Sequence, residues 1–109
     1  MRTKTFFEIC KKGTLIEVMD ALADGADVNE RGLIKNEGKN LKWTSLMLAV
    51  DNNDEPLVSL LLEQPGIEVN AQDEYGRTAL HHAAFKDNRN VSKLLLNFPG
   101  IDINVTNEN

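Results

Sequence analysis

The property that most constrains this chain is an internal repeat of 34 residues. Residues 43–72 read WTSLMLAVDNNDEPLVSLLLEQPGIEVNAQ, and residues 77–106 read RTALHHAAFKDNRNVSKLLLNFPGIDINVT. Both segments have threonine in second place, a leucine triplet before a Pro-Gly pair, and asparagine near the end, all at one constant offset. Repetition at a fixed period of this length is typical of proteins in which small structural units stack against one another.

A looser third copy at residues 6–29 precedes these two. Each copy is predicted to form a helix, a tight turn, a second helix and a turn into an extended segment. TFFE at residues 5–8 and TLIE at residues 14–17 both fit the capping box, in which side chains satisfy free amides at a helix start. Gly13 lies between them and is expected to end the first helix in a left-handed conformation.

Similar signals mark the later helices. Thr44 and Thr78 suit the N-cap position of the first helix in each later copy. Asp54, Glu55 and Pro56 suit the start of a second helix. Acidic residues favour the positive end of the helix dipole, and proline is tolerated in the first turn.

TALHHAA at residues 78–84 closely resembles the T-P-L-H-x-A signature of ankyrin repeats, and GADVN at residues 25–29 resembles that family's turn into a β-hairpin. The resemblance covers nearly the whole chain. It implies an all-α ankyrin-repeat solenoid of helix-turn-helix units with short β-hairpin loops. The expected parts of this single domain, 1–109, are a capping repeat at 1–29, an extended hairpin insertion at 30–43, a second repeat at 44–76, and a third repeat with the start of a further one at 77–109.

The sequence departs from the family pattern at a few positions. Ser45 and Ala79 replace the signature proline, and Met47 replaces the histidine in the middle repeat. Asn53 and Asp87 stand where the family usually has glycine between its two helices. Both residue types tolerate the left-handed conformation that such a turn requires.

The adjacent histidines His81 and His82 raise the question of a metal or catalytic site. The resemblance implies that His81 makes a structural hydrogen bond near the helix start and that His82 occupies a variable position. Adjacent helical residues point about 100° apart, so the pair lacks the i, i+4 spacing of a chelating pair. We predict that these histidines bind no metal and perform no catalysis.

No other pattern indicates chemistry. Cys10 is the only cysteine, which excludes an intrachain disulfide and a cysteine-based zinc site. By the resemblance it occupies a small buried helix position, where a packed thiol is expected. The sequence has no arrangement resembling a nucleophile with its base, and no glycine-rich phosphate loop. We therefore expect neither enzymatic activity nor a cofactor.

Charge and hydropathy exclude further classes. The formal net charge of −5 argues against a general binder of nucleic acid or anionic membranes. The N-terminus lacks the apolar run of a signal peptide, and no stretch approaches membrane-spanning length. A single thiol fits a reducing compartment, so we expect an intracellular protein, cytoplasmic or nuclear.

The first hairpin carries an insertion. Fourteen residues separate Asn29 from Thr44, whereas seven separate Asn70 from Thr78. Insertions in repeat proteins map to loops, often on the binding face, although a flexible surface loop without function is an equal alternative. The insertion is net basic, whereas residues 44–76 contain seven acidic and no basic residues. This acidic segment suggests either a solvated surface or a partner with a complementary basic patch.

The resemblance implies that a partner binds the concave face, formed by hairpin tips and the exposed side of the first helices. Stacked repeats should bring Trp43, Arg77, Tyr75 and Phe85 into one continuous aromatic and cationic strip that faces the groove, flanked by acidic residues. The alternative is that the aromatic side chains only cover the base of the hairpin. The ten residues expected to bind another protein are Lys11, Lys12, Trp43, Asp51, Asn52, Glu74, Tyr75, Arg77, Phe85 and Lys86. Two alternative functions are a binder of a small anionic or nucleotide-like ligand and a structural spacer within a longer repeat array.

The C-terminal end is expected to be incompletely capped. The chain stops at residues 107–109, where the family pattern would continue into another helix pair. Some of the apolar residues Val91, Leu94, Leu95, Leu96 and Phe98 should then be exposed. We expect either a fragment of a longer protein or self-association through this end.

Overall fold

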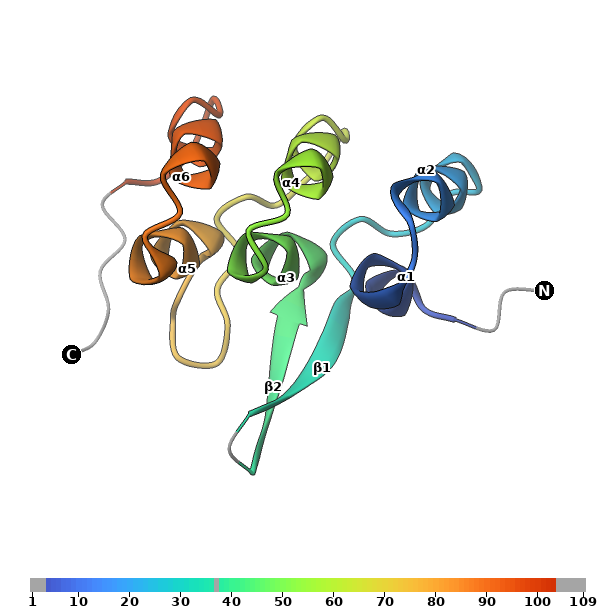
Figure 1. Cartoon of the computed structure of the whole chain (residues 1–109), viewed down its shortest axis with the longest axis horizontal. Coiled ribbons are helices and arrows are strands. Elements are labelled where there is room, and N and C mark those ends of the chain that lie inside the picture. Colours follow the sequence, from blue (N-terminus) through green and yellow to red (C-terminus); the bar gives the residue numbers. More distant parts are fainter. Residues whose placement is uncertain (1–3, 37, 104–109) are drawn as a thin grey trace.

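The computed structural model describes residues 4–36 and 38–103 of the chain. In Figure 1, α1, α3 and α5 lie side by side in one layer, α2, α4 and α6 form a second layer, and a hairpin extends from the first layer. The elements are α1 (Phe6–Lys12), α2 (Leu15–Ala23), β1 (Arg31–Asn36), β2 (Lys39–Thr44), α3 (Ser45–Asp51), α4 (Glu55–Leu62), α5 (Ala79–Lys86) and α6 (Arg89–Leu96). The expected start of a further repeat, within residues 104–109, lies outside the described residues.

The helices begin where side chains satisfy their first amides. Thr5 and Thr14 both form complete capping boxes, with Glu8 and Glu17 as the reciprocal partners. Thr44, Asp54 and Thr78 likewise accept hydrogen bonds from amides in the first turns of α3, α4 and α5. The predicted N-caps are therefore confirmed.

The turns between paired helices follow two different conformations. Asn53 and Asp87 have φ angles of 54° and 57°, so the left-handed conformation predicted for these positions is confirmed. The prediction for Gly13 is wrong, because its φ of −88° and ψ of 176° place it in extended backbone. Glycine instead suits a close contact there, since an added Cβ would lie 2.7 Å from the carbonyl oxygen of Ile9.

The core runs between the two helix layers. The middle residue of each leucine triplet, Leu61 and Leu95, is fully buried together with Val58 and Val91. Leu96 is 50% exposed, so the expectation of apolar exposure on the last helix is met by this residue and not by Val91 or Leu95. Within the described residues, no helix combines the length and apolar character needed to cross a bilayer.

The insertion forms an antiparallel hairpin of β1 and β2 with a continuous register from Arg31↔Thr44 to Asn36↔Lys39. It is thus a paired structure rather than an irregular loop. Leu41 is buried and Ile34 packs against the core. At its base the hairpin approaches α1 so closely that a methyl group added at Gly32 would overlap the ring of Phe7.

Two asparagines connect successive helix pairs. The amide of Asn29 donates to the carbonyl of Gly66 at 2.8 Å, and its Oδ1 accepts from the backbone N–H of Glu68 at 2.9 Å. Asn70 makes the same two bonds, at 2.9 Å each, to Gly100 and Asp102. The side chains of these two asparagines therefore bridge neighbouring repeats.

Candidate partner-binding groove

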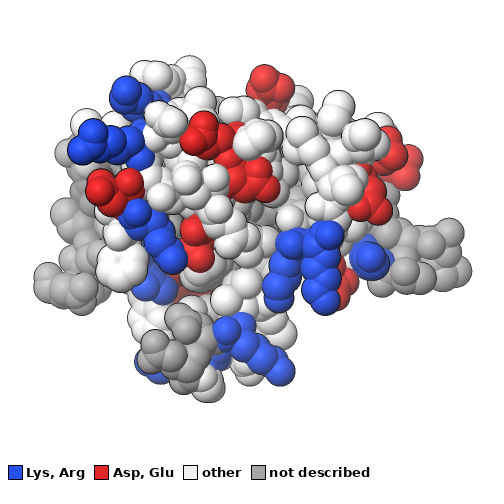
Figure 2. All heavy atoms as spheres, viewed as in Figure 1, with Lys and Arg blue, Asp and Glu red and all other residues white. Residues whose placement is uncertain are grey.

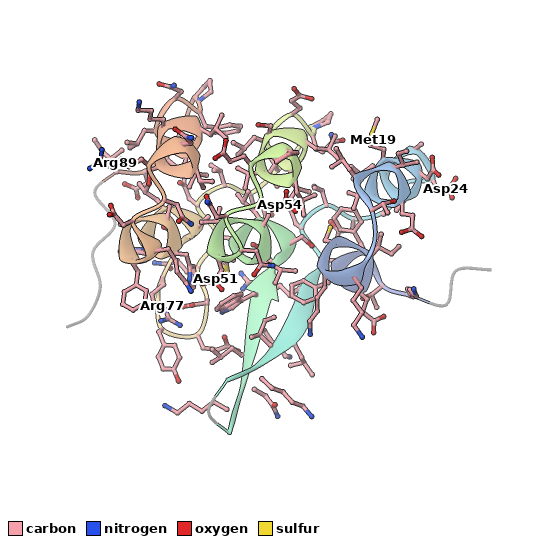
Figure 3. The ribbon with its side chains drawn as sticks, viewed as in Figure 1. Met19, Asp24, Asp51, Asp54, Arg77 and Arg89 are labelled. Carbon is pink, nitrogen blue, oxygen red and sulfur yellow. The ribbon has the colours of Figure 1, made fainter. Side chains whose placement is uncertain are left out.

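A hollow of about 800 Å³ lies where α1, the hairpin, α3 and α5 meet, and we call it the groove. In Figure 3, Asp51 and Arg77 lie on the hairpin side of the helices, whereas Met19 lies with α2 and Arg89 with α6. The groove is lined by Lys11, Leu33, Ile34, Lys35, Trp43, Leu48, Asp51, Asn52, Arg77, His82, Phe85 and Lys86. Seven of the ten predicted binding residues are in this lining; Lys12, Glu74 and Tyr75 are not.

Trp43 forms part of the groove floor instead of projecting from it. Only 6% of the residue is exposed, and its ring meets that of His82 edge-on, with centroids 4.7 Å apart. Trp43 is therefore no exposed member of the predicted strip, and its burial fits the alternative in which this aromatic side chain covers the base of the hairpin. Trp43 lies on the side of β2 that faces the helices. Its repeat counterpart Arg77 lies in a turn, and its side chain stays one-third exposed.

Asp73 organises the turn that leads into α5. Its Oδ1 accepts from the backbone N–H groups of Tyr75 and Arg77, and its Oδ2 accepts from Arg77 Nε, each at 2.9 Å. Burial alone would raise the pKa of Asp73, but these bonds outweigh it and hold the pKa below its usual value. A buried acid therefore fixes the position of Arg77 at the groove.

His82 lies beneath the groove and next to Asp73. Its Nε2 is 3.4 Å from Asp73 Oδ2, without the geometry of a hydrogen bond. Burial lowers the pKa of His82, and this effect exceeds the opposing effect of the Asp73 charge. The assignment of His82 to a variable helix position missed its burial. Its packing partner Trp43 comes from the preceding repeat, so no local pattern in the sequence could have revealed the contact.

The exposed aromatic residues lie at and beside the groove. Phe85 is 88% exposed and lines it from α5. Tyr75 is 45% exposed and lies outside the lining. Two cations lie over its ring: the guanidinium carbon of Arg77 is 4.9 Å from the ring centroid, and Lys39 Nζ is 5.6 Å from it. The predicted strip is thus partly present, with Phe85 and Arg77 at the groove and Tyr75 adjoining it.

Glu74 is exposed, and its side chain also makes a contact within the chain. Its two carboxylate oxygens accept from the backbone N–H of Lys42 at 3.0 and 2.8 Å, joining the turn before α5 to the edge of β2. Asp54 caps α4, and Glu55 accepts from the side chain of Asn90. Of the seven acidic residues in 44–76 only Asp73 is buried; the other six stay at least partly exposed, although some of them also make internal contacts.

The hairpin contributes three lining residues that the sequence analysis missed: Leu33, Ile34 and Lys35. A signal for them exists in the chain. In β2, Leu41 and Trp43 alternate with the polar residues Asn40, Lys42 and Thr44, which is the period-two pattern of a half-buried strand. From that pattern, the insertion could have been predicted to form a strand that packs against the helices and lines the groove.

The histidine pair divides between two structural positions. His81 Nδ1 accepts from the backbone N–H of Thr78 at 3.0 Å and completes the capping box of α5, so its predicted hydrogen-bonding role is confirmed. Among residues 4–36 and 38–103, no three His, Cys, Asp or Glu side chains form a group that could hold a metal ion.

Cys10 is buried as predicted, and burial raises the pKa of its thiol to about 11.

Three helix pairs in register, linked by equivalent asparagine bonds, define a tandem-repeat protein built from helix-turn-helix units. A family model for ankyrin repeats, in three copies, matches residues 6–107, so the chain belongs to the ankyrin-repeat family. Repeats of this family are generally protein-interaction modules. A comparison with curated proteins finds no match to the chain.

Proposed function

We propose that this chain is a non-catalytic recognition module that binds a polypeptide partner in the groove. The observation that carries the proposal is the lining of the groove, which draws on the hairpin and on the first helix of all three pairs. In this proposal the three pairs act as a short solenoid, divided at residues 29, 43 and 76. Each unit supplies side chains to one continuous surface.

The groove combines a fixed floor with an exposed aromatic residue. Trp43 and His82 are packed together before any partner arrives, so they need no ordering on binding. Phe85 is the most exposed large apolar side chain described, and covering it would remove a substantial apolar area from water. Binding hot spots commonly combine such aromatic residues with arginine, which Arg77 provides.

Affinity capture from an extract of the source cells tests the proposal. The immobilised chain is compared with a Phe85→Ser variant and with Ile16→Ser, a control in which another exposed residue, 70% accessible on α2, loses its apolar side chain. We expect specific proteins to bind the wild type and the control but not Phe85→Ser. Equal capture by all three folded chains contradicts binding in the groove.

The volume of the groove also lies within the range of small-molecule sites, which supports an anionic ligand as a second candidate. The face of Trp43 is less suited to stacking because the residue is buried against His82. Calorimetric titration with ATP separates the two functions. Saturable ATP binding that Phe85→Ser abolishes would favour the ligand over the polypeptide.

We place the interaction inside the cell, in the cytoplasm or nucleus. The support is the single cysteine, whose buried thiol suits a reducing compartment. Fluorescence imaging of the tagged chain in the source cells tests this location. Accumulation in a secretory compartment contradicts it.

A further inference from the structure

The groove has the opposite charge to the rest of the molecule. The whole chain has a formal net charge of −5. The charged residues of the groove lining are nevertheless Lys11, Lys35, Arg77 and Lys86, with Asp51 as the one acid among them. Figure 2 shows lysine and arginine side chains over the hairpin, beside it and at the α6 end of the molecule, and most of the acidic side chains over the helices above the hairpin. A basic groove thus lies within an acidic protein.

Two of the four cations are paired internally. Arg77 is held by the buried Asp73 at 2.9 Å, and Lys86 Nζ lies 3.6 Å from Asp51 Oδ1. Within the part of the chain that the structure describes, Lys11 and Lys35 form no ion pair. These two exposed amines, from α1 and β1, are therefore open to charges on a partner.

Apolar side chains lie beside these amines. Leu33 on β1 is more than half exposed, and Phe85 on α5 is almost fully exposed, although both line the groove. Exposed apolar side chains beside lysines suit a ligand that has both anionic and apolar groups. A chain of amino acids can present both within a few residues.

We propose that the groove binds an acidic polypeptide segment, whose carboxylates face Lys11 and Lys35 and whose aromatic or long aliphatic side chain covers Phe85. This inference rests on the proposed function and specifies the chemistry of its partner. Opposite potentials on the two surfaces accelerate encounter and disfavour basic partners. The segment bound in the groove must be short, because the remaining surface of the chain is acidic and repels further negative charge.

The same charge distribution disfavours nucleic acid. A nucleic-acid strand carries a phosphate charge every few ångströms along its whole length, including the parts that would extend beyond the groove. Those parts would lie against acidic helices, whereas a peptide can place neutral residues there. The surface charge therefore separates the two classes of partner.

Selection from a phage-displayed library of random dodecapeptides tests the inference. The wild-type chain is the bait, and enriched peptides are counter-screened on Phe85→Ser. We expect the peptides that depend on Phe85 to be rich in Asp and Glu and to contain an aromatic or long aliphatic residue. A synthetic copy of the most enriched peptide, labelled with a fluorophore, then provides the probe for affinity measurements.

Two double variants with the same net charge distinguish the effect of charges in the groove from the effect of the total charge of the protein. Lys11→Glu with Lys35→Glu reverses the two open amines, and Arg89→Glu with Lys93→Glu reverses two exposed charges on α6, so both variants have the same net charge. We expect the groove variant to weaken peptide binding about tenfold, because each exposed charge pair contributes modestly. The α6 variant should bind within about twofold of the wild type, because charges on distant surface are screened by salt.

Each contrary result has a distinct meaning. Phe85-dependent peptides that are neutral or basic, or that bind both charge variants equally, overturn the acidic partner and leave the proposed function standing. If no peptide depends on Phe85, the proposed function fails and the inference fails with it. Displacement of the acidic peptide by a single-stranded DNA 20-mer at equal concentration overturns the assignment to polypeptide.

Discussion

At the scale of single residues, Asp73 shows how a polar side chain inside a turn can determine the geometry of an exposed neighbour. Its carboxylate accepts hydrogen bonds from two backbone N–H groups and from the side chain of Arg77, and these bonds hold Arg77 at the groove. The sequence marks Asp73 only as one acid among seven in its segment. Its structural importance could not be predicted, because the bonds depend on the conformation of the turn.

Replacing Asp73 by alanine should lower the free energy of unfolding by about 2–4 kcal/mol at pH 7, since charge-assisted bonds are lost and buried donors are left unpaired. Because its folded pKa is below the unfolded value of 3.8, the charged carboxylate stabilises the fold above about pH 4. That contribution is lost as the pH falls further towards the folded pKa. Urea denaturation of both chains from pH 7 to pH 2.5 measures it, with the exposed Asp20→Ala as control. A difference in stability that stays constant over this range contradicts the assignment.

His81 offers a second test at this scale. His81→Ala removes the acceptor for the backbone N–H of the buried Thr78 and should destabilise the fold by about 1–3 kcal/mol. His81→Gln should cost less, because glutamine at the same helix position can complete a capping box. Thermal and urea unfolding of the two variants provide the comparison. Equal loss in both would show that packing, and not the hydrogen bond, explains the effect.

At the scale of secondary-structure elements, the helices were predictable and the hairpin only in part. Threonines and acids mark the helix starts because capping is a local interaction between residues close in sequence. The hairpin was predicted as an insertion of known position, but its packing depends on contacts with other elements. Trp43 is buried against His82, 39 positions later. The alignment of Trp43 with Arg77 therefore predicted the position of Trp43 in the repeat correctly, but it did not predict that its side chain is buried.

The contact between the hairpin and α1 makes a steric prediction. Gly32→Ala places a methyl group against the ring of Phe7, which is itself buried, and should destabilise the fold by about 1–3 kcal/mol. A double variant with Phe7→Leu should recover part of the loss, because the smaller side chain leaves room. A double-mutant cycle by urea denaturation measures this coupling. Additive effects of the two substitutions would contradict close packing of Gly32 on Phe7.

At the scale of the whole molecule, repetition predicts the order of the helix pairs, and the bonds between pairs hold them in register. Asn29 and Asn70 make equivalent bonds to the next turn, although the insertion places them 41 positions apart instead of 34. The recurrence of asparagine was visible in the sequence, but its long-range partners were not. Sequence therefore predicted the units better than the contacts that join them into a groove.

The exposed apolar side chains of the last unit predict weak self-association. Leu96 on α6 and Ile103 beyond it are both at least half exposed. We expect the apparent mass to rise with protein concentration in sedimentation equilibrium, and Leu96→Ser to reduce that rise. The Ile16→Ser variant controls for loss of an apolar side chain on another surface. A wild-type chain that stays monomeric at millimolar concentration contradicts the prediction.

The bond between Glu74 and the backbone amide of Lys42 joins segments 32 positions apart, at an edge of β2 that pairs with no other strand among the residues that the structure describes. Because the acceptor belongs to the turn before α5, the exchange rate of this one amide hydrogen reports how often that turn separates from the hairpin. Glu74→Ala should accelerate deuterium uptake at Lys42 about tenfold or more, while Leu41, paired with Ile34 inside the hairpin, changes little. In the wild-type chain, the exchange rate of this amide would then show whether a bound partner tightens or loosens the contact between the hairpin and the turn before α5.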